Sequence, residues 1–545
     1  MTKLYKTLFA VLIICLGACT DLDVPPENRA TADVVLTTPE SYKQFLAKLY
    51  AGLATTGQEG PAGNGDVGGI DEGFSQYIRN YWKVQELSTD EAVIGWGDEG
   101  IRDFHAHNWT SQNQFIAGFY YRAYYQIALA NEFLRETTEG KLIERGIGDA
   151  LKAEVTVFRA EARFLRALSY WHLLDLFRNV PFVTEASPTT VNPSQVPPVE
   201  LFDFIETELL EIESGVSGEQ LIDAGANEYG RADKGAAWTL LAKLYLNAEV
   251  YGAGAHYTEA VTYAKNVIGS GAYSLADVYR HNFLADNHTS PEMIFSVNFD
   301  GTRTQGYGGT TFLVFSNIGG TLVDTDAGTA FRGEFLGVNG GWAGVRTTSA
   351  LVNLFPSSDD PYPEVIGDAD SRGIFWTEGQ SKEIGDIPNY PGNGYGVLKY
   401  SNVTAAGEPG SNPNFPDTDF PMFRLADVYL MYAEAVLRGG TGGTASEAVG
   451  YINDLRERAY GDTSGNITEG QLTLDFILDE RARELYFEAH RRTDLIRFDQ
   501  FSDNGIWPWK GGVAEGRVSE SFRDIYPLPA SDIIANTNLV QNDPY

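Results

Sequence analysis

Three aromatic residues lie in loops where glycine neighbours leave their rings open to solvent. Trp96 and Tyr307 each stand between two glycines, and Trp342 follows one. An exposed ring suits a sugar, because the C–H faces of a sugar are apolar while its hydroxyl groups need hydrogen-bonding partners around the rim. The three residues are therefore candidates for a carbohydrate-binding surface. Each ring taken singly could equally pack in the core of an irregular subdomain.

Carboxylates with helical spacing form a second group that could do chemistry. Glu480, Glu484 and Glu488 are four residues apart and would share one face of a helix. Paired carboxylates can act as acid and base in glycoside hydrolysis. Arginines are interleaved with them, at Arg481, Arg483, Arg491 and Arg492. The pattern therefore favours a network of ion pairs that attaches the last long helix to the rest of the protein.

Three aspartates have the side chains that calcium prefers. Asp417 and Asp419 are two residues apart, and Asp286 could complete the set. Carboxylate oxygens are hard ligands that suit Ca²⁺, so we predict a structural calcium site at these residues. The alternative role for Asp417 and Asp419 is to cap a helix that begins near Phe423.

The sequence lacks the motifs of common catalytic and nucleotide-binding sites. It has no G-x-S-x-G, no H-E-x-x-H and no phosphate-binding loop. Gly63, Gly65 and Gly68 match G-x-G-x-x-G, but no expected strand or helix flanks them, so we interpret them as a loop. His105 and His107 have no third metal ligand nearby, which favours polar packing. Apart from calcium, no cofactor is predicted.

The charge balance limits the partners. The chain carries 74 acidic and 40 basic residues, a formal net charge of −34. Such a surface repels nucleic acids and other polyanions. We therefore exclude nucleic acid as a partner and expect any polymeric ligand to be neutral.

The N-terminus has the features of a bacterial lipoprotein signal. Two lysines precede an apolar run over residues 8–17, and Leu-Gly-Ala-Cys ends at Cys19. The run is too short to span a bilayer. We predict a signal peptide over residues 1–18, lipidation of Cys19 and an acidic tether over residues 19–37. A plain secretory peptide is the alternative. The other cysteine, Cys15, would be removed with the signal, which leaves no disulfide.

Helical hairpins are expected to position these residues. Trp238, Leu241, Ala242 and Tyr245 match the first-helix pattern of a tetratricopeptide repeat, W-x2-L-G/A-x2-Y, and a second helix follows within residues 231–271. More degenerate hairpins are predicted at 111–180 and 423–458. A single repeat cannot bury its apolar face alone. We therefore predict a mostly α fold in which tetratricopeptide-like hairpins form a scaffold.

A loop-rich subdomain is expected between the hairpins, over residues 57–110 and 300–421. These segments are rich in glycine, asparagine, threonine and aromatic residues, and they contain all three candidate rings. Short apolar pieces such as Thr311–Phe315 are expected to pair as small strands. Long loops in a compact protein are usually functional. We predict that residues 38–545 form a single domain.

Several ordered segments resemble the SusD/RagB family. The resemblance begins with the lipoprotein signal and acidic tether and then runs through AEARFLRALSYWHLLDLF (160–177), GRADKGAAWTLLAKLYLNAEVY (230–251), FPDTDFPMFRLADVYL (415–430), ERARELYFEAHRRTDLIRF (480–498) and YPLPASDI (526–533). Further segments are most similar to a starch-binding member: TGQEG (56–60), DEG (71–73), ELSTDEAVIGW (86–96), YGGTTFLV (307–314) and WPWKGG (507–512).

The resemblance implies a function and a site. Members of the family are surface glycan-binding lipoproteins of Gram-negative bacteria that sit on a SusC-like TonB-dependent outer-membrane transporter. Trp96, Tyr307 and Trp342 match starch-contacting aromatics of the family, and Arg79 matches a hydrogen-bonding residue beside them. Glu99 stands where the family pattern has asparagine, which puts the preference among neutral glycans in doubt.

The expected function is therefore non-catalytic. The chain would be held in the outer membrane by its lipid, face the cell exterior, bind a neutral glycan such as an α-glucan, and pass it to the transporter. Binding of a different neutral glycan is an alternative. A glycoside hydrolase that uses two of the many carboxylates, and a structural or adhesion lipoprotein, are less favoured.

Overall fold

The computed structural model describes residues 31–61, 63, 65–319, 336–356, 370–387 and 393–545, with the backbone of 323–324 and 329–330. The signal peptide, Cys19 and the tether up to residue 30 lie outside the described residues, so those predictions remain predictions. Within these ranges, no helix combines the length and apolarity needed to cross a bilayer.

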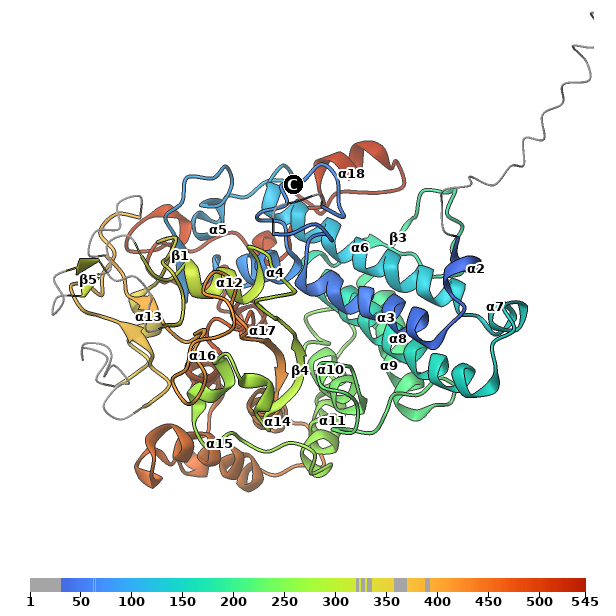
Figure 1. Ribbon diagram of the computed structural model, residues 1–545. Helices are drawn as coiled ribbons and strands as arrows, with labels where there is room; N and C mark the ends of the chain where they lie inside the picture. Colours follow the sequence, from blue (N-terminus) through green and yellow to red (C-terminus); the bar gives the residue numbers. More distant parts are fainter. Residues whose placement is uncertain are drawn as a thin grey trace, which may run out of the picture.

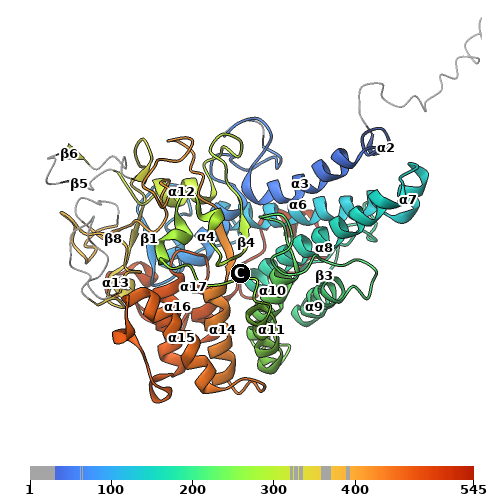
Figure 2. The same ribbon diagram turned by 60° about the horizontal axis from the view of Figure 1, so that its bottom comes forward.

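A row of long helices forms the scaffold, and each helix packs against the next one (Figure 1). The row comprises α6 (Gln114–Glu136), α8 (Asp149–Phe177), α9 (Pro198–Ser214), α10 (Lys234–Leu246), α11 (Tyr257–Gly269), α14 (Leu425–Leu437) and α15 (Ala445–Tyr460). Figure 2 shows α10, α11, α14 and α15 side by side. The predicted mostly α scaffold of tetratricopeptide-like hairpins is confirmed.

The repeat-pattern residues of α10 fill the grooves toward its neighbours. Ala242 is fully buried, so the next helix can approach closely. The ring of Tyr245 stacks with that of Tyr263 in α11, with 5.7 Å between centroids. The indole N–H of Trp238 donates to the Glu213 carboxylate of α9 at 3.1 Å. The pattern therefore links α10 to the helices on both sides.

Short antiparallel strand pairs organise the loops around the scaffold. The pairs are β1 (Ala92–Ile94) with β7 (Val345–Thr347), β4 (Met293–Val297) with β10 (Phe420–Arg424), β2 (Val180–Pro181) with β3 (Gln195–Val196), β5 (Val323–Asp324) with β6 (Thr329–Ala330), and β8 (Phe375–Trp376) with β9 (Gly396–Val397). Since β10 runs directly into α14, the β4–β10 pair attaches the loop-rich part to the scaffold.

Two buried helices in this region differ from the sequence-based expectation. The segment expected as a strand, Thr311–Phe315, forms most of helix α12 (Gly309–Phe315), so that prediction is wrong. Every residue of α12 is buried, and a short helix buried all round shows no amphipathic period that would separate it from a strand. Helix α4 (Tyr77–Glu86) is also buried all round, although Tyr77, Ile78, Tyr81 and Trp82 give it an apolar stripe and its other face carries charged residues.

The remaining helices surround the row or close its ends. They are α2 (Ala32–Val35), α3 (Pro39–Ala54), α5 (Asp103–Ala106), α7 (Glu139–Glu144), α13 (Ser349–Val352), α16 (Leu474–Leu485), α17 (Arg491–Arg497) and α18 (Ala530–Ala535). Thr38 begins α3 with a capping box, in which the side chains at the two ends of the first turn satisfy free backbone N–H groups. The residues between α16 and α17 are not helical, and φ is positive at Phe487 and Ala489. Glu488 therefore does not continue the face of α16.

The acidic residues of α16 lie in a buried ion-pair network. Glu484 pairs with Arg424 at 2.7 Å, Arg458 at 2.5 Å and Arg372 at 3.1 Å, and all four side chains are almost completely buried. Burial alone would raise the pKa of Glu480, but the surrounding arginines, Arg372 first, lower it to about 2. The predicted network is confirmed. Its main cations come from distant segments, because Arg481 and Arg491 pair with other acids.

Candidate functional site

The β1–β7 pair brings Trp96 and Trp342 together. The N–H of Gly95 donates to the carbonyl of Gly344 at 3.0 Å, which continues the ladder just beyond the strands. The indole N–H of Trp96 then donates to the carbonyl of Trp342 at 3.3 Å, and the ring centroids are 6.4 Å apart. A Cβ atom at Gly344 would lie 2.3 Å from the Trp96 ring. Position 344 must therefore be glycine for the rings to keep this arrangement.

Tyr307 adds a third ring beside Trp342. It precedes α12, and its ring centroid is 6.1 Å from that of Trp342, with 69° between the planes. Its side chain is 38% exposed, whereas both tryptophans are half-buried. Trp342 also packs on Phe315 of α12 at 5.2 Å. Trp96, Trp342 and Tyr307 thus form a continuous series of mutually tilted rings, which we call the aromatic arc.

Arg79 of α4 joins the loops that carry the arc. Its Nη1 donates to the carbonyls of Gly73 and Tyr307, each at 2.8 Å. Its guanidinium carbon is 5.7 Å from the ring centroids of both Trp96 and Trp342, so the cation also interacts with both ring systems. One side chain therefore contacts all three rings or their backbone.

The charge of Arg79 is retained although the side chain is only 8% exposed. Burial lowers the pKa of Arg79 to about 10, against the opposing effect of the nearby Asp98 and Asp71 carboxylates. The guanidinium is therefore protonated at neutral pH. Within the described ranges its Nη2 makes no hydrogen bond, so this donor is available to a ligand.

Glu99 lies in the exposed loop that follows Trp96. Its backbone carbonyl accepts a hydrogen bond from Gln114 Nε2 at 2.7 Å, which anchors this loop on α6. Its carboxylate makes no hydrogen bond to any residue that the structure describes.

The three aspartates proposed as calcium ligands have other roles. Asp417 accepts from the N–H groups of Gly301 and Ser411, Asp419 accepts from the N–H of Phe299, and Asp286 accepts from the N–H of Ala405. In the described part of the chain, no group of three or more His, Cys, Asp or Glu side chains could hold a metal ion. The capping alternative is also wrong, because α14 begins after Arg424 and has no side-chain cap. The aspartates instead fix loops around β4 and β10.

Polar packing explains the paired histidines. His107 Nδ1 lies 2.9 Å from Ser519 Oγ, and its Nε2 lies 2.8 Å from the Ser88 carbonyl. Burial lowers the pKa of His107 to about 3 and that of His105 to about 4. Both rings are therefore neutral at physiological pH, and the polar-packing interpretation is confirmed.

Two aromatic residues at the site were not predicted. Phe312 lies 4.8 Å from the Arg79 guanidinium and 6.0 Å from the Trp96 ring, within the helix that was expected to be a strand. Phe415 lies 6.0 Å from the Tyr307 ring, beyond the end of the arc. Phe415 stands between asparagine and proline, so the glycine-flank criterion could not find it. The signal available in the sequence was a single aromatic residue within a long polar loop.

Two family models match the chain. The model described as "SusD family" matches residues 370–545, and the model described as "Starch-binding associating with outer membrane" matches residues 22–246. Together they cover both ends of the helical row.

Individual relatives agree with these models. The chain is 35% identical to the starch-binding protein SusD of Bacteroides thetaiotaomicron over all of both chains, and 28% identical to the SusD-like protein P2 of Formosa agariphila over 99% of both. Among solved structures, surface glycan-binding protein A of B. thetaiotaomicron, in complex with laminarihexaose, superposes with a TM-score of 0.67 at 19% identity, over 92% of this chain and 99% of that one. That likeness supports the fold alone. Members of the family are carbohydrate-binding proteins and not enzymes, and this chain belongs to the SusD family.

Proposed function

We propose that this protein binds a neutral α-glucan on the aromatic arc, at the outer surface of the cell, and delivers it to a SusC-like TonB-dependent transporter. Trp96, Trp342 and Tyr307 would stack on successive sugar units. Arg79 Nη2 would donate to a sugar hydroxyl group, and the Glu99 carboxylate would accept from another.

The observation that carries the proposal is the shape of the arc. Its rings follow one another at 6.4 and 6.1 Å, with 46° and 69° between neighbouring planes. Rings that are turned against one another in this way would suit a glucan that coils, as α-linked glucans do, better than a flat chain. The 35% identity to a protein named as starch-binding points to the same class of ligand.

A second candidate is a different coiled neutral glucan. Solved neighbours include a laminarin-binding protein, and a β-1,3-glucan also curves. Glu99 is the position at which the preference among neutral glycans could differ, because a carboxylate only accepts hydrogen bonds whereas the asparagine of the family pattern also donates. A glycosidase is disfavoured by position, since Glu480, Glu484 and Glu488 are buried among arginines and cannot reach a polysaccharide.

Affinity electrophoresis tests the proposal directly. The chain from Asp21 onward keeps every described residue, and it is run through gels that contain amylopectin, laminarin or an anionic polysaccharide. We expect the wild type to be retarded in amylopectin. In Trp96→Ala and Trp342→Ala the binding free energy should weaken by about 2 kcal/mol, as for buried aromatic anchors, so retardation should decrease. Trp238→Ala is the matched control, because its half-buried indole also donates a hydrogen bond. Wild-type retardation of folded Trp96→Ala would refute the arc. Stronger retardation in laminarin would favour the second candidate.

The anchor and the transporter need separate tests. Cys19→Ala should release the protein from membranes or leave uncleaved precursor, whereas unchanged membrane partitioning would contradict lipidation. Protease added to intact cells should degrade the anchored protein if it faces the exterior. A pull-down from solubilised outer membrane should recover a large barrel protein, and its absence would contradict the proposed partner.

A further inference from the structure

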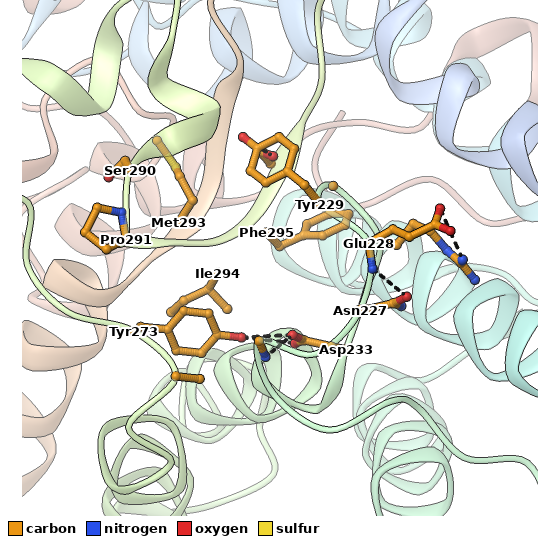
Figure 3. Close-up of a pocket in the computed structure, with 15 residues that line it drawn as sticks. Asn227, Glu228, Tyr229, Asp233, Tyr273, Ser290, Pro291, Met293, Ile294 and Phe295 are labelled. Atoms are coloured by element: carbon orange, nitrogen blue, oxygen red, sulfur yellow. Dashed lines mark hydrogen bonds and ion pairs between the residues drawn. The ribbon is translucent and has the colours of Figure 1, made fainter. Parts of the chain in front are cut away.

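A hollow lies beside the start of α10, and none of the arc residues line it. Its volume is about 240 Å³, and it is lined by the loop over residues 225–233, the turn at 272–273, and Ser290 to Ser296 around β4 (Figure 3). Met293, Ile294 and Phe295 of β4 contribute apolar surface.

Two tyrosine rings with fixed hydroxyl groups wall this hollow. Tyr229 donates to the Asp419 carboxylate at 2.7 Å and accepts from Ser296 Oγ at 3.0 Å. The Tyr273 hydroxyl donates to Asp233 at 3.0 Å. Figure 3 shows the two rings on different sides of the hollow, with Ile294 between them. Because both hydroxyls are held, the aromatic faces are preorganised for a ligand.

Glycines set the close packing of these walls. A Cβ atom at Gly235 would lie 2.2 Å from the Tyr273 hydroxyl oxygen. At Gly230, where φ is +78°, a Cβ atom would lie 2.0 Å from the Asn298 amide. The walls of the hollow therefore depend on the absence of side chains at Gly230 in the loop and at Gly235 at the start of α10.

The charges around the hollow are already paired. Glu228 forms ion pairs with Lys43 at 2.8 Å and Arg231 at 3.6 Å. The buried Asp233 carboxylate accepts from the N–H groups of Gly225 and Ala236 as well as from Tyr273. No carboxylate remains to attract a cation, and no cation remains to attract an anion, so the hollow suits a neutral ligand.

Residues 228–231 also line an adjacent hollow of about 230 Å³. Its other lining residues are Lys43, Leu46, Ala47, Tyr50 and Asn298. Each hollow is smaller than the roughly 300–1,000 Å³ typical of drug-sized ligands, so each would take one ring-sized unit. Tyr229, which is 44% exposed, is common to both hollows. Two such spaces in succession match a chain of repeating units better than a single amino-acid side chain.

We propose that these two hollows form a second binding site for a neutral oligosaccharide, with consecutive sugar units on either side of Tyr229. The saccharide class of the ligand rests on the proposed function, but the location is independent of the arc. Two sites for one polymer would raise the overall avidity without any new contact at the arc.

Calorimetric titration of a protein with a disabled arc tests the second site. The double variant Trp96→Ala/Trp342→Ala, in the chain from Asp21 onward, is titrated with maltotriose, laminaritriose and, as a competing chemistry, a phenylalanine-containing dipeptide. We expect saturable binding of at least one trisaccharide. Adding Ala272→Trp should weaken that binding at least tenfold, because the indole would fill the hollow without removing an existing contact.

Tyr229→Ala is a second, independent variant, because it removes the ring that lines both hollows. It should also weaken binding at least tenfold. Tyr451→Ala is the control, since Tyr451 is a half-buried tyrosine of α15 that stacks on Tyr429. Binding of the dipeptide alone, no trisaccharide binding, or binding that Ala272→Trp leaves unchanged would each overturn the second site.

These results also separate the two proposals. Binding by the wild type that vanishes in the double variant would overturn the second site and leave the arc standing. Binding that is the same in both proteins and is lost with Ala272→Trp would support the second site and refute the arc.

Discussion

The indole N–H of Trp96 donates to the backbone carbonyl of Trp342 at 3.3 Å, across 246 positions of the chain. This bond holds the Trp96 indole against the backbone of the loop that carries Trp342. The flanking glycines allow it, because Gly344 leaves room for the Trp96 ring. The relative placement of the rings therefore depends on backbone packing as much as on the rings themselves.

Gly344→Val should disable the arc without removing an aromatic residue. The new side chain would collide with the Trp96 ring, so we expect glucan binding to weaken at least tenfold while the fold is retained. Gly97→Val is the matched control, because a Cβ atom at Gly97 meets nothing within 4 Å. Retardation in amylopectin gels and circular dichroism check the two expectations. Equal retardation of the two variants would contradict this account of Gly344.

Glu99→Asn should strengthen amylopectin binding several-fold. An amide can donate to a sugar hydroxyl as well as accept from one, whereas the carboxylate only accepts. Glu515→Asn, at an exposed position elsewhere, should leave binding unchanged. Calorimetric titration with maltoheptaose and laminariheptaose measures the effect on each glucan. A shift toward laminariheptaose, or no shift at all, would argue against this role for Glu99.

Glu480→Gln should destabilise the protein by about 3 kcal/mol at neutral pH, because it leaves buried arginines without one partner. The pKa of Glu480 is lowered from 4.5 to about 2. Its ionised form therefore contributes stability above pH 4.5, and this contribution is lost as the pH falls toward 2. Urea unfolding should show that the difference between wild type and variant narrows over that range. A difference independent of pH would contradict the assignment. Glu139→Gln, at an exposed site, is the control.

Chelation should leave thermal stability unchanged. Asp417, Asp419 and Asp286 each accept hydrogen bonds from backbone N–H groups, so the loops they hold do not need an ion. Scanning calorimetry with and without excess EDTA checks this expectation. A lower midpoint that Ca²⁺ restores would reinstate the calcium site. Asp419→Asn should cost about 1–3 kcal/mol in either condition, because it weakens buried hydrogen bonds.

The scaffold could be predicted because its helices are amphipathic or carry a repeat pattern. The spacing of Trp238, Leu241, Ala242 and Tyr245 predicts both a helix and its packing against neighbouring helices, and the residues lie in α10 as predicted. Helix α12 carries neither signal, whereas α4 has an apolar stripe that does not reveal the burial of its charged face. Arg79 and Lys83 are polar residues on a helix that is buried on all sides, so the usual rule that polar residues face solvent fails there.

The site was predicted only as far as its rings lie in glycine-rich loops. Local sequence and the family resemblance singled out Trp96, Tyr307 and Trp342 as candidates, but not their arrangement. The β1–β7 pairing joins Trp96 to Trp342, and Tyr307 lies beside Trp342 just before α12. The pairing itself joins three-residue strands that are far apart in sequence, and no local pattern encodes it. For Asp417 and Asp419 the local pattern was misleading. Their spacing suits a metal, but their carboxylates accept hydrogen bonds from nearby backbone N–H groups.

The distance along the chain between β1 and β7 also bears on how the protein matures. Strand β1 is made early, but its partner follows about 250 residues later. Closing so long a loop has a large entropic cost, and contacts of this kind form late in folding. A newly made chain would thus form its local helical hairpins before the β1–β7 pairing that brings Trp96 to Trp342. A fragment that ends before residue 345 could contain well-formed hairpins and still be unable to hold sugar.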